Sequence, residues 1–357
     1  MVSLARGSCL KVLIAASATL AVVLVLHQVS YTTPSSFALT SQPVQVLKSC
    51  PQSPNSESLS YDAKPSSADE PIPKIIHQLW KTTNISTYPS TPSHASWQTL
   101  LGPESYTVKL WTDESVLDLI RQNYTWLLST YESYAHNIQR ADVARLVVVH
   151  AEGGVYADLD VHPRSAAAVA CLRQAQTQQQ QQRRRRQNGN LQAIFAATGG
   201  NAGLSNHFFM AARGSDFLAW ALREAKRRAG PPSRRILLPY LRVFWSTGPL
   251  MLTAAYQQYA WMYDDDDDDD GGGGGVRGGG PPLVALLDET YARTVFGHAA
   301  GRSWHGSDGR FLNYVSDHVG TGGLWFGVPC LLVVFGLFCF VRRCRGERRS
   351  ALELYRC

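Results

Sequence analysis

The chain has 357 residues, of which 45% are hydrophobic and 17% charged, so it is long enough for one substantial folded domain with accessory segments. The net charge of +6 does not favour nucleic-acid binding, because the arginines cluster at 183–186 and near the carboxyl terminus and are not interleaved with aromatic residues. Seven cysteines do not make a disulfide framework in a chain of this length.

Two apolar runs flank the central part of the chain, one at 12–26 after basic residues and one at 324–341 before them. Each approaches the roughly 20 residues that a membrane-spanning helix needs. A cleavable signal peptide is the alternative for the first run. With a signal anchor, the positive-inside rule predicts a cytosolic amino terminus over 1–11, spans over 12–29 and 320–341, and a basic cytosolic tail over 342–357.

Everything between the two runs is expected to lie in the lumen of a secretory compartment. Residues 30–70 are rich in serine, threonine and proline without hydrophobic periodicity, which predicts a flexible stem before a folded domain over 71–318. In this lumenal part, Asn84 and Asn123 stand in glycosylation sequons. Cys50 and Cys171 either pair as a disulfide or remain two thiols.

The domain begins with an alternation of strands and helices. Residues 74–80 and 107–111 are predicted buried strands, and Thr112 or Asp113 begins a helix that runs to about Tyr124. A second helix is predicted over 137–152 and a short strand over 155–160. This order predicts an α/β fold with a mostly parallel sheet.

Two inserts interrupt the domain. The first, 174–190, is a glutamine tract closed by four arginines, and the second, 264–280, joins seven aspartates to a glycine-rich run. Neither insert has apolar surface to bury, so both are expected to be disordered surface loops. The aspartate run has no defined coordination geometry and does not predict a specific calcium site.

The segment Asp158-Leu159-Asp160 is the candidate centre of chemistry. On an extended segment its two carboxylates would point the same way and could share one divalent ion. Such an ion neutralises the charge that builds on a departing nucleoside diphosphate during sugar transfer. The alternative without a function is a surface loop in which both aspartates are solvated. Upstream, Asp142 and Arg145 fall on one face of a predicted helix. They either form an ordinary helical ion pair or bind the hydroxyls and phosphate of the sugar donor.

Four blocks in this order and spacing resemble glycosyltransferase family 32: they lie at 72–80, 110–113, 138–145 and 153–160. The family is similar in this core to the sugar-transferring toxins of clostridia. The resemblance implies a GT-A fold, which is a Rossmann-like nucleotide-binding domain. The catalytic and donor-binding residues that it implies are Asp142, Arg145, Asp158, Asp160, His77, Trp80 and Tyr156.

The likeness continues at 204–206, 245–249 and 301–308, and with the following apolar run it resembles the catalytic subunits of fungal mannosyl inositol phosphorylceramide synthases. It implies transfer of mannose from GDP-mannose to a sphingolipid at the Golgi membrane, with Mn²⁺ and a regulatory membrane subunit as potential partner. It puts Asn206, Thr247, Gly248 and Trp304 near donor or acceptor. His305 is the expected third metal ligand, since imidazole suits manganese.

The acceptor is less well defined than the metal site, because Val161-His162-Pro163 replaces the further acidic or glycine residues common in the family. A rival function is an α-1,6-mannosyltransferase that acts on fungal glycoprotein glycans. The second apolar run favours a lipid acceptor, because tethers at both ends would hold the active site near the bilayer.

Two functions from other classes remain. A catalytically silent membrane scaffold subunit is disfavoured by the intact acidic and arginine positions. A metal-dependent phosphoesterase would need a denser cluster of His and Asp ligands for two ions. Because no carboxylate stands out as a nucleophile, the predicted mechanism is retaining, with the departing phosphate helping to deprotonate the acceptor hydroxyl.

Overall fold

The computed structural model describes residues 16–17, 19–24, 26–28, 44–50, 72–173, 191–198, 203–262, 283–299 and 306–319. These residues divide into two compact units. The larger unit takes the described residues between 44 and 236 and between 242 and 299, and the smaller takes those up to 28, 237–241 and those from 306. Both predicted inserts, Trp304, His305 and the predicted span at 320–341 lie outside the described residues.

The elements alternate along the chain as an α/β fold requires. The strands are β1 (Gln45–Leu47), β2 (Ile75–Leu79), β3 (Thr107–Trp111), β4 (Gly154–Ala157), β5 (Val161–Pro163), β6 (Leu191–Thr198), β7 (Gly203–Ala211), β8 (Leu283–Leu287) and β9 (Phe296–His298). The α-helices are α2 (His94–Leu101), α3 (Asp113–Asn123), α4 (Thr125–Ser133), α5 (Asn137–Glu152), α7 (Asp216–Arg228), α8 (Pro231–Arg234), α9 (Pro239–Ser246), α10 (Pro249–Trp261), α11 (Glu289–Val295) and α12 (Ser307–Val319). Residues 166–173 are also helical, and 3₁₀ turns lie at η3 (Ile85–Thr87) and η4 (Gly102–Glu104).

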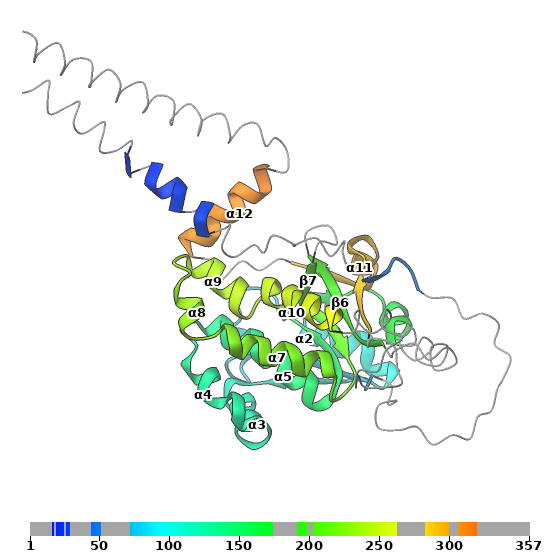
Figure 1. Ribbon diagram of the computed structural model, residues 1–357. Coiled ribbons are helices and arrows are strands. Elements are labelled where there is room, and N and C mark those ends of the chain that lie inside the picture. Colours follow the sequence, from blue (N-terminus) through cyan, green and yellow to red (C-terminus); the bar gives the residue numbers. More distant parts are fainter. Residues whose placement is uncertain are drawn as a thin grey trace, which may run out of the picture. The chain divides into compact units, whose positions relative to one another are not determined.

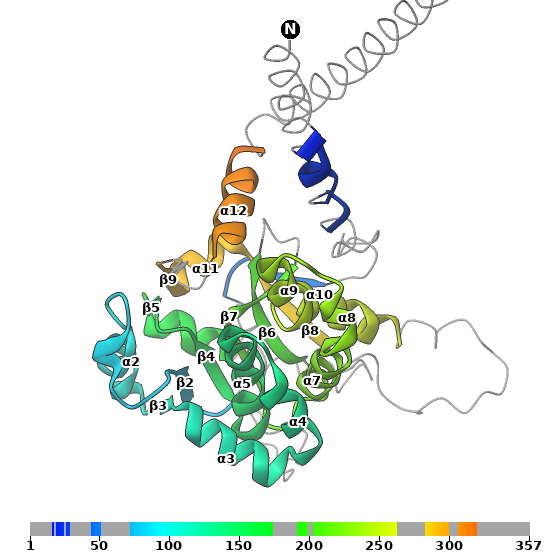
Figure 2. The ribbon, with the colours of Figure 1, turned by 90° about the vertical axis from the view of Figure 1, so that its left-hand side faces the viewer.

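Seven strands of the larger unit form one sheet in the order β1-β8-β6-β7-β4-β2-β3. Figure 1 labels β6 and β7 of this sheet, and Figure 2 also labels β2, β3, β4 and β8. Neighbouring strands are parallel except where β7 is involved, since β7 runs antiparallel to both β6 and β4. A separate antiparallel pair joins β5 to β9, with Val161 opposite His298. The mostly parallel α/β sheet expected from the sequence is confirmed.

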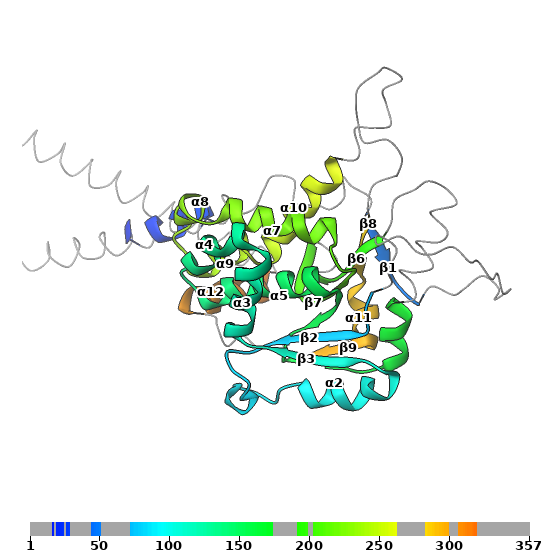
Figure 3. The same ribbon diagram turned by 90° about the horizontal axis from the view of Figure 1, so that it is seen from below.

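Helices cover both faces of this sheet (Figure 3), so the side chains that alternate along a strand enter two different cores. On β7, Phe209 and Ala211 pack in the core that α5, α7 and α10 close. Phe208 and Met210 pack in the second core, under α2, the helical residues 166–173 and α11. The sheet is therefore the middle layer of three.

The predicted elements around the motif blocks are confirmed nearly residue for residue. β2 and β3 occupy 75–79 and 107–111, and α5 spans Asn137–Glu152. Thr112 is the N-cap of α3, and its hydroxyl accepts a hydrogen bond from Ser115 N at 3.2 Å. Local capping and periodicity are enough to define these elements.

Two glycines connect α5 to β4. Gly153 and Gly154 have φ values of +69° and +112°. A Cβ atom would lie 2.7 Å from Arg213 N at the first position and 2.6 Å from Ile75 O at the second. Glycine is therefore required at both, and this turn delivers the chain into the strand that precedes the acidic motif.

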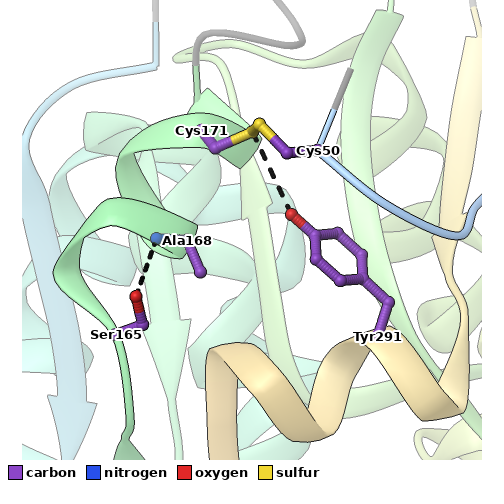
Figure 4. The surroundings of a disulfide bond; sticks show 5 residues. All are labelled: Cys50, Ser165, Ala168, Cys171 and Tyr291. Carbon is purple, nitrogen blue, oxygen red and sulfur yellow. Dashed lines mark hydrogen bonds between the residues drawn. A yellow bond between two sulfur atoms is a disulfide. The ribbon is translucent and has the colours of Figure 1, made fainter. Parts of the chain in front are cut away.

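The folded domain begins before residue 71, and the expectation of a stem throughout 30–70 is wrong in this respect. β1 lies inside that range and pairs in parallel with β8 at the edge of the sheet. β1 has only three residues in a serine-rich segment, which is too short for a hydrophobic periodicity to show. This strand forms because a distant segment, β8, pairs with it. Cys50, just after β1, is bonded to Cys171, and the Tyr291 hydroxyl donates to Cys171 Sγ at 4.0 Å (Figure 4). The choice between disulfide and thiols is thereby resolved.

The smaller unit contains the described part of the first apolar run and α12. Tyr240 N donates to Asp308 Oδ2 at 2.8 Å, and Leu237 N donates to Gln28 Oε1 at 2.7 Å. Because α12 belongs here, the predicted domain limit at 318 does not coincide with the boundary between the units. No helix within the described ranges is long and apolar enough to cross a membrane.

Candidate active site

Helix α5 is buried in the core, and it carries an acid and a base there. Asp142 is 4% and Arg145 5% exposed. Arg145 Nη2 lies 3.4 Å from Asp142 Oδ1, which confirms the predicted pairing one helical turn apart. A buried ion pair is stable only when further hydrogen bonds satisfy both partners, so the other contacts of these two side chains define the site.

Asp142 is held by side chains from two other elements. Asn206 Nδ2, on β7, donates to Oδ1 at 2.9 Å, and Thr247 Oγ1, after α9, donates to Oδ2 at 2.9 Å. Burial raises the pKa of Asp142 to about 6, against the opposing effect of Arg145 and of these two hydrogen bonds. Asn206 and Thr247 were expected near donor or acceptor, and in the structure they position Asp142.

Gly248, the next residue, makes the close contact that begins α10. A Cβ atom there would lie 2.9 Å from Phe244 Cα, inside van der Waals contact. The predicted turn around Thr247 and Gly248 therefore positions the Thr247 hydroxyl that donates to Asp142. Gly248 contributes to the turn only by allowing this close backbone approach.

Arg145 connects Asp142 to the acidic motif. Its Nη1 lies 3.2 Å from Asp158 and donates to Asn206 O at 3.0 Å. Its guanidinium carbon is 5.1 Å from the ring centre of Tyr156, whose hydroxyl donates to Asp158 Oδ1 at 2.7 Å. Burial by itself would lower the pKa of Arg145. The charges of Asp158, Tyr156 and Asp142 outweigh burial and raise this pKa. The arginine is therefore a permanent cation between two acids.

The acidic motif is a turn. β4 ends at Ala157, and Val161 N donates to Asp158 O at 2.9 Å, which closes a four-residue turn. The expectation that this segment is extended is therefore wrong, and aspartate is a residue that favours turns. Neighbouring segments fix its backbone by three hydrogen bonds: Asp158 N to His207 O at 2.9 Å, Ser93 N to Leu159 O at 2.8 Å, and Ala299 N to Asp160 O at 3.0 Å.

The two aspartates have different surroundings. The Asp158 side chain is 26% exposed and both of its oxygens contact Arg145, whereas the Asp160 side chain is 7% exposed and its Oδ2 lies 3.5 Å from His298 Nε2. Burial raises the pKa of Asp158, Arg145 opposes the shift, and the charge of Asp160 adds to it. The two carboxylates are thus close enough to repel each other.

Two residues of the site were missed by sequence reasoning. His298 lies after the aspartate-rich insert and reaches the motif only through the pairing of β9 with β5. Tyr88 follows η3, and burial, Asp160 and Asp158 together raise its pKa to about 12. Trp80 packs edge-on against Tyr88 with ring centres 5.0 Å apart, so the expected donor residue Trp80 lies next to this group. No local pattern marks either missed residue.

His77 does not join the cluster. Its ring is fully buried, with Nε2 2.7 Å from Gly153 O and Nδ1 accepting from Trp111 Nε1 at 3.0 Å. Both ring nitrogens are used inside the fold, where they connect β2, β3 and the α5–β4 turn. Burial accordingly lowers the pKa of His77. Its contacts are structural.

The two predicted glycosylation sites lie at the surface. Asn84 and Asn123 are both exposed, the first before η3 and the second at the end of α3. Trp304 and His305 fall outside the described residues. Within the described ranges, no three His, Cys, Asp or Glu side chains gather as a metal site made of protein groups alone.

Residues 81–182 match the glycosyltransferase sugar-binding region containing the DXD motif. This range contains Asp142, Arg145, Tyr156 and both acids of the motif turn. Over this range, which is less than a third of the chain, the sequence is similar to DXD-containing glycosyltransferases.

Curated relatives match over most of the chain. Inositol phosphoceramide mannosyltransferase 3 of Schizosaccharomyces pombe is 31% identical over 69% of this chain and 60% of its own length. Inositol phosphoceramide mannosyltransferase 1 of the same yeast is 27% identical over 80% and 79%. The mannosyl phosphorylinositol ceramide synthase SUR1 of Saccharomyces cerevisiae is 28% identical over 79% and 66%. The chain thus spans about 60% of the first relative.

Among solved structures, the PaToxG glycosyltransferase matches 56% of this chain and 75% of its own, with 18% sequence identity and a TM-score of 0.37. A similarity at this level supports no conclusion about the fold.

Proposed function

We propose that the chain is a retaining mannosyltransferase that moves mannose from GDP-mannose to inositol phosphorylceramide. The names of the relatives at 27–31% identity support mannose as the sugar and inositol phosphoceramide as the acceptor. The observation that carries the proposal is the buried network of Asp142, Arg145 and Asp158. Burying three charges is costly for a fold, and such networks with shifted pKa values concentrate where chemistry requires them.

The architecture proposed is a GT-A domain. Its support is the position of the motif turn, which directly follows β4 in a mostly parallel sheet with helices on both faces. In open α/β sheets, ligands bind beyond the carboxyl ends of the strands. The donor nucleotide would therefore lie over the end of β4.

The metal proposed is Mn²⁺, held by the acidic motif. The fit rests on the chemistry of the side chains: two carboxylates repel each other in the turn, Arg145 compensates Asp158, and Asp160 faces an imidazole. Oxygen and imidazole ligands suit manganese. When bound, a divalent cation would neutralise negative charge on the donor diphosphate.

The chain's own residues would bind and orient the donor. Arg145 and Tyr156 hold Asp158 in place and favour its ionised form against the effect of burial. The exposed quarter of this side chain can accept hydrogen bonds from the hydroxyls of mannose. The phenol of Tyr88, with its pKa of about 12, stays protonated and can donate to a phosphate oxygen. Trp80, beside it, offers an aromatic surface to the nucleotide.

The proposed transfer retains configuration without a covalent enzyme intermediate, and the contacts of Asp142 and Asp158 support the absence of such an intermediate. Both oxygens of Asp142 accept hydrogen bonds from Asn206 and Thr247, and both oxygens of Asp158 contact Arg145. Neither acid is presented as a nucleophile. In the proposed step the bond from mannose to phosphate breaks, the bond from mannose to the acceptor oxygen forms on the same face, and the hydroxyl proton passes to the departing phosphate.

The setting proposed is the lumenal side of a Golgi membrane, with the spans at 12–29 and 320–341 as anchors, glycans on Asn84 and Asn123, and a regulatory membrane subunit as a potential partner. The exposure of both asparagines supports the glycan sites.

The test is an assay of membranes that contain the full chain, supplied with radiolabelled GDP-mannose and either inositol phosphorylceramide or a high-mannose glycoprotein. Label in the lipid extract is expected. Label only in the glycoprotein would contradict the proposal in favour of the α-1,6-mannosyltransferase. No label in either acceptor would favour the silent scaffold.

A further inference from the structure

A pocket of about 380 Å³ lies on the larger unit between residues of α3, α4, α5 and α7. Helices α4 and α7 both pack against α5 (Figure 1). None of the lining residues belongs to the network of Asp142, Arg145 and Asp158, so the pocket is separate from the candidate active site. Its volume is at the lower end of the range of about 300–1,000 Å³ for small-molecule sites, which suits a ligand of the size of one sugar ring.

The lining combines an aromatic surface with polar groups. Trp126 lines the pocket and is 39% exposed, and Leu222 supplies apolar surface from α7. The hydroxyl of Tyr124 lies 2.6 Å from His150 Nδ1, and Arg223 is exposed. A sugar ring has the matching chemistry, because its C–H faces pack on aromatic rings while its hydroxyl and acetamide groups form hydrogen bonds at the edge. The lining therefore suits a carbohydrate.

The indole of Trp126 is held in place before any ligand arrives. Lys226, on α7, donates a hydrogen bond to Trp126 O, and its Nζ lies 5.4 Å from the centre of the Trp126 ring. These contacts connect the start of α4 to α7. A surface that is ordered in advance loses little side-chain entropy when it binds.

A glycosylation sequon lies at the same pocket. Asn123 ends α3, is exposed and belongs to the pocket lining. The rest of the sequon is Tyr124, which is 6% exposed, and Thr125, which begins α4. The first sugar of a glycan on Asn123 would start at the pocket, and tethering gives it a high effective concentration there. A weak intrinsic affinity for carbohydrate is then sufficient for occupancy.

We propose that this pocket binds the first N-acetylglucosamine of a glycan attached to Asn123, with the sugar ring packed on Trp126. The inference rests on the lumenal setting of the proposed function, since only there are glycans added to asparagine. Asn84 provides the contrast. It does not line this pocket, and its side chain accepts hydrogen bonds from the backbone and hydroxyl of Ser86. A glycan on Asn84 is therefore not expected to stabilise the fold through this pocket.

The test uses the full-length protein produced in fungal cells. Asn84→Gln leaves Asn123 as the glycosylated residue, and endoglycosidase H trims its high-mannose glycan to one N-acetylglucosamine. The intact and trimmed forms should melt at the same temperature. The double variant Asn84→Gln/Asn123→Gln, without sugar, should melt about 2–4 °C lower, as expected for the loss of one aromatic packing contact. Asn123→Gln alone is the matched control, and it should melt with the double variant although it carries the Asn84 glycan.

A second measurement reports on Trp126 itself. Hydroxyl-radical oxidation read by mass spectrometry should lose most of its signal at Trp126 when the trimmed form is compared with the double variant. Trp261, 61% exposed at the end of α10, should be oxidised equally in both. This comparison does not depend on any difference in melting temperature.

The proposal is overturned if mass spectrometry finds no sugar on Asn123, if the trimmed form melts with the double variant, or if Trp126 is oxidised equally in the two. These outcomes are separable from those of the transfer assay. A protein whose first sugar protects Trp126 but which labels no lipid would refute the proposed function and leave the pocket assignment intact. Transfer to lipid by a protein with unmodified Asn123 would refute the pocket assignment alone.

Discussion

Thr247→Val removes one hydroxyl group from the buried network and keeps the shape of the side chain. The hydroxyl donates to Asp142 Oδ2 at 2.9 Å, and Thr247 is fully buried, so water cannot replace it. Removing one donor from a buried carboxylate costs about 1.5–3 kcal/mol of unfolding free energy. The pKa of Asp142 should also rise further, because this hydrogen bond lowers it.

The same change should lower catalysis. Asp142 shares Arg145 with Asp158, so a shifted Asp142 displaces the arginine that orients the motif. Misplacement on this scale typically reduces turnover by about 10–100-fold. The assay is transfer of labelled mannose per folded molecule, with the folded fraction measured by thermal unfolding.

Thr253→Val is the matched control. Thr253 is 1% exposed on α10, and its hydroxyl donates to Pro249 O at 2.8 Å and accepts from Leu204 N at 3.0 Å. This variant should lose stability as well, by about 1 kcal/mol or more, but keep its rate per folded molecule. Equal rates in the two valine variants would refute the reasoning that the hydrogen bond to Asp142 serves catalysis.

Three further predictions follow from single contacts. Tyr156→Phe removes the hydroxyl that donates to Asp158 at 2.7 Å and keeps the ring, so turnover per folded molecule should fall about tenfold. An unchanged rate would contradict the role given to this hydroxyl. Replacing Cys50 and Cys171 together by serine should lower the free energy of unfolding by about 3–5 kcal/mol. Dithiothreitol should lower the melting temperature of the wild type and leave that of the double variant unchanged. A lower melting temperature in both proteins would contradict the disulfide as the cause of the loss. In the wild type, burial gives Asp142 a pKa of about 6 against an ordinary value of 3.8, so the folded state binds the proton more tightly. This group's contribution of about 3 kcal/mol to the free energy of unfolding is lost as pH rises from about 4 to 6. Asp142→Asn should lack that decline in its urea unfolding midpoints, and a pH profile identical to that of the wild type would contradict this assignment.

Local signals were sufficient for the elements that carry the network. Thr112 caps α3, the Gly153-Gly154 pair ends α5, and the spacing of Asp142 and Arg145 determines that they pair. Each of these features depends on residues a few positions apart, where capping, positive φ and helical periodicity act directly. The sequence therefore predicts where the network is mounted.

Contacts between distant segments were beyond such reasoning. β1 is a strand because β8 is available at the sheet edge, and His298 meets Asp160 because β9 pairs with β5. The motif block around His77 predicted a donor contact, but hydrogen bonds within the core occupy that ring. Sequence patterns identify residue types suited to a task, and the tertiary fold decides which of them meet.

The most direct measurement of the central claim compares the wild type with Asp160→Asn in the transfer of labelled mannose from GDP-mannose to inositol phosphorylceramide. The substitution removes one charge from the motif turn and keeps its shape. Asp118→Asn, at an exposed position on α3, is the control for the loss of a carboxylate. We predict that Asp160→Asn abolishes transfer at equal protein amount and equal melting temperature, while Asp118→Asn keeps the wild-type rate. Transfer by Asp160→Asn at the wild-type rate would contradict the assignment of this turn as the catalytic centre.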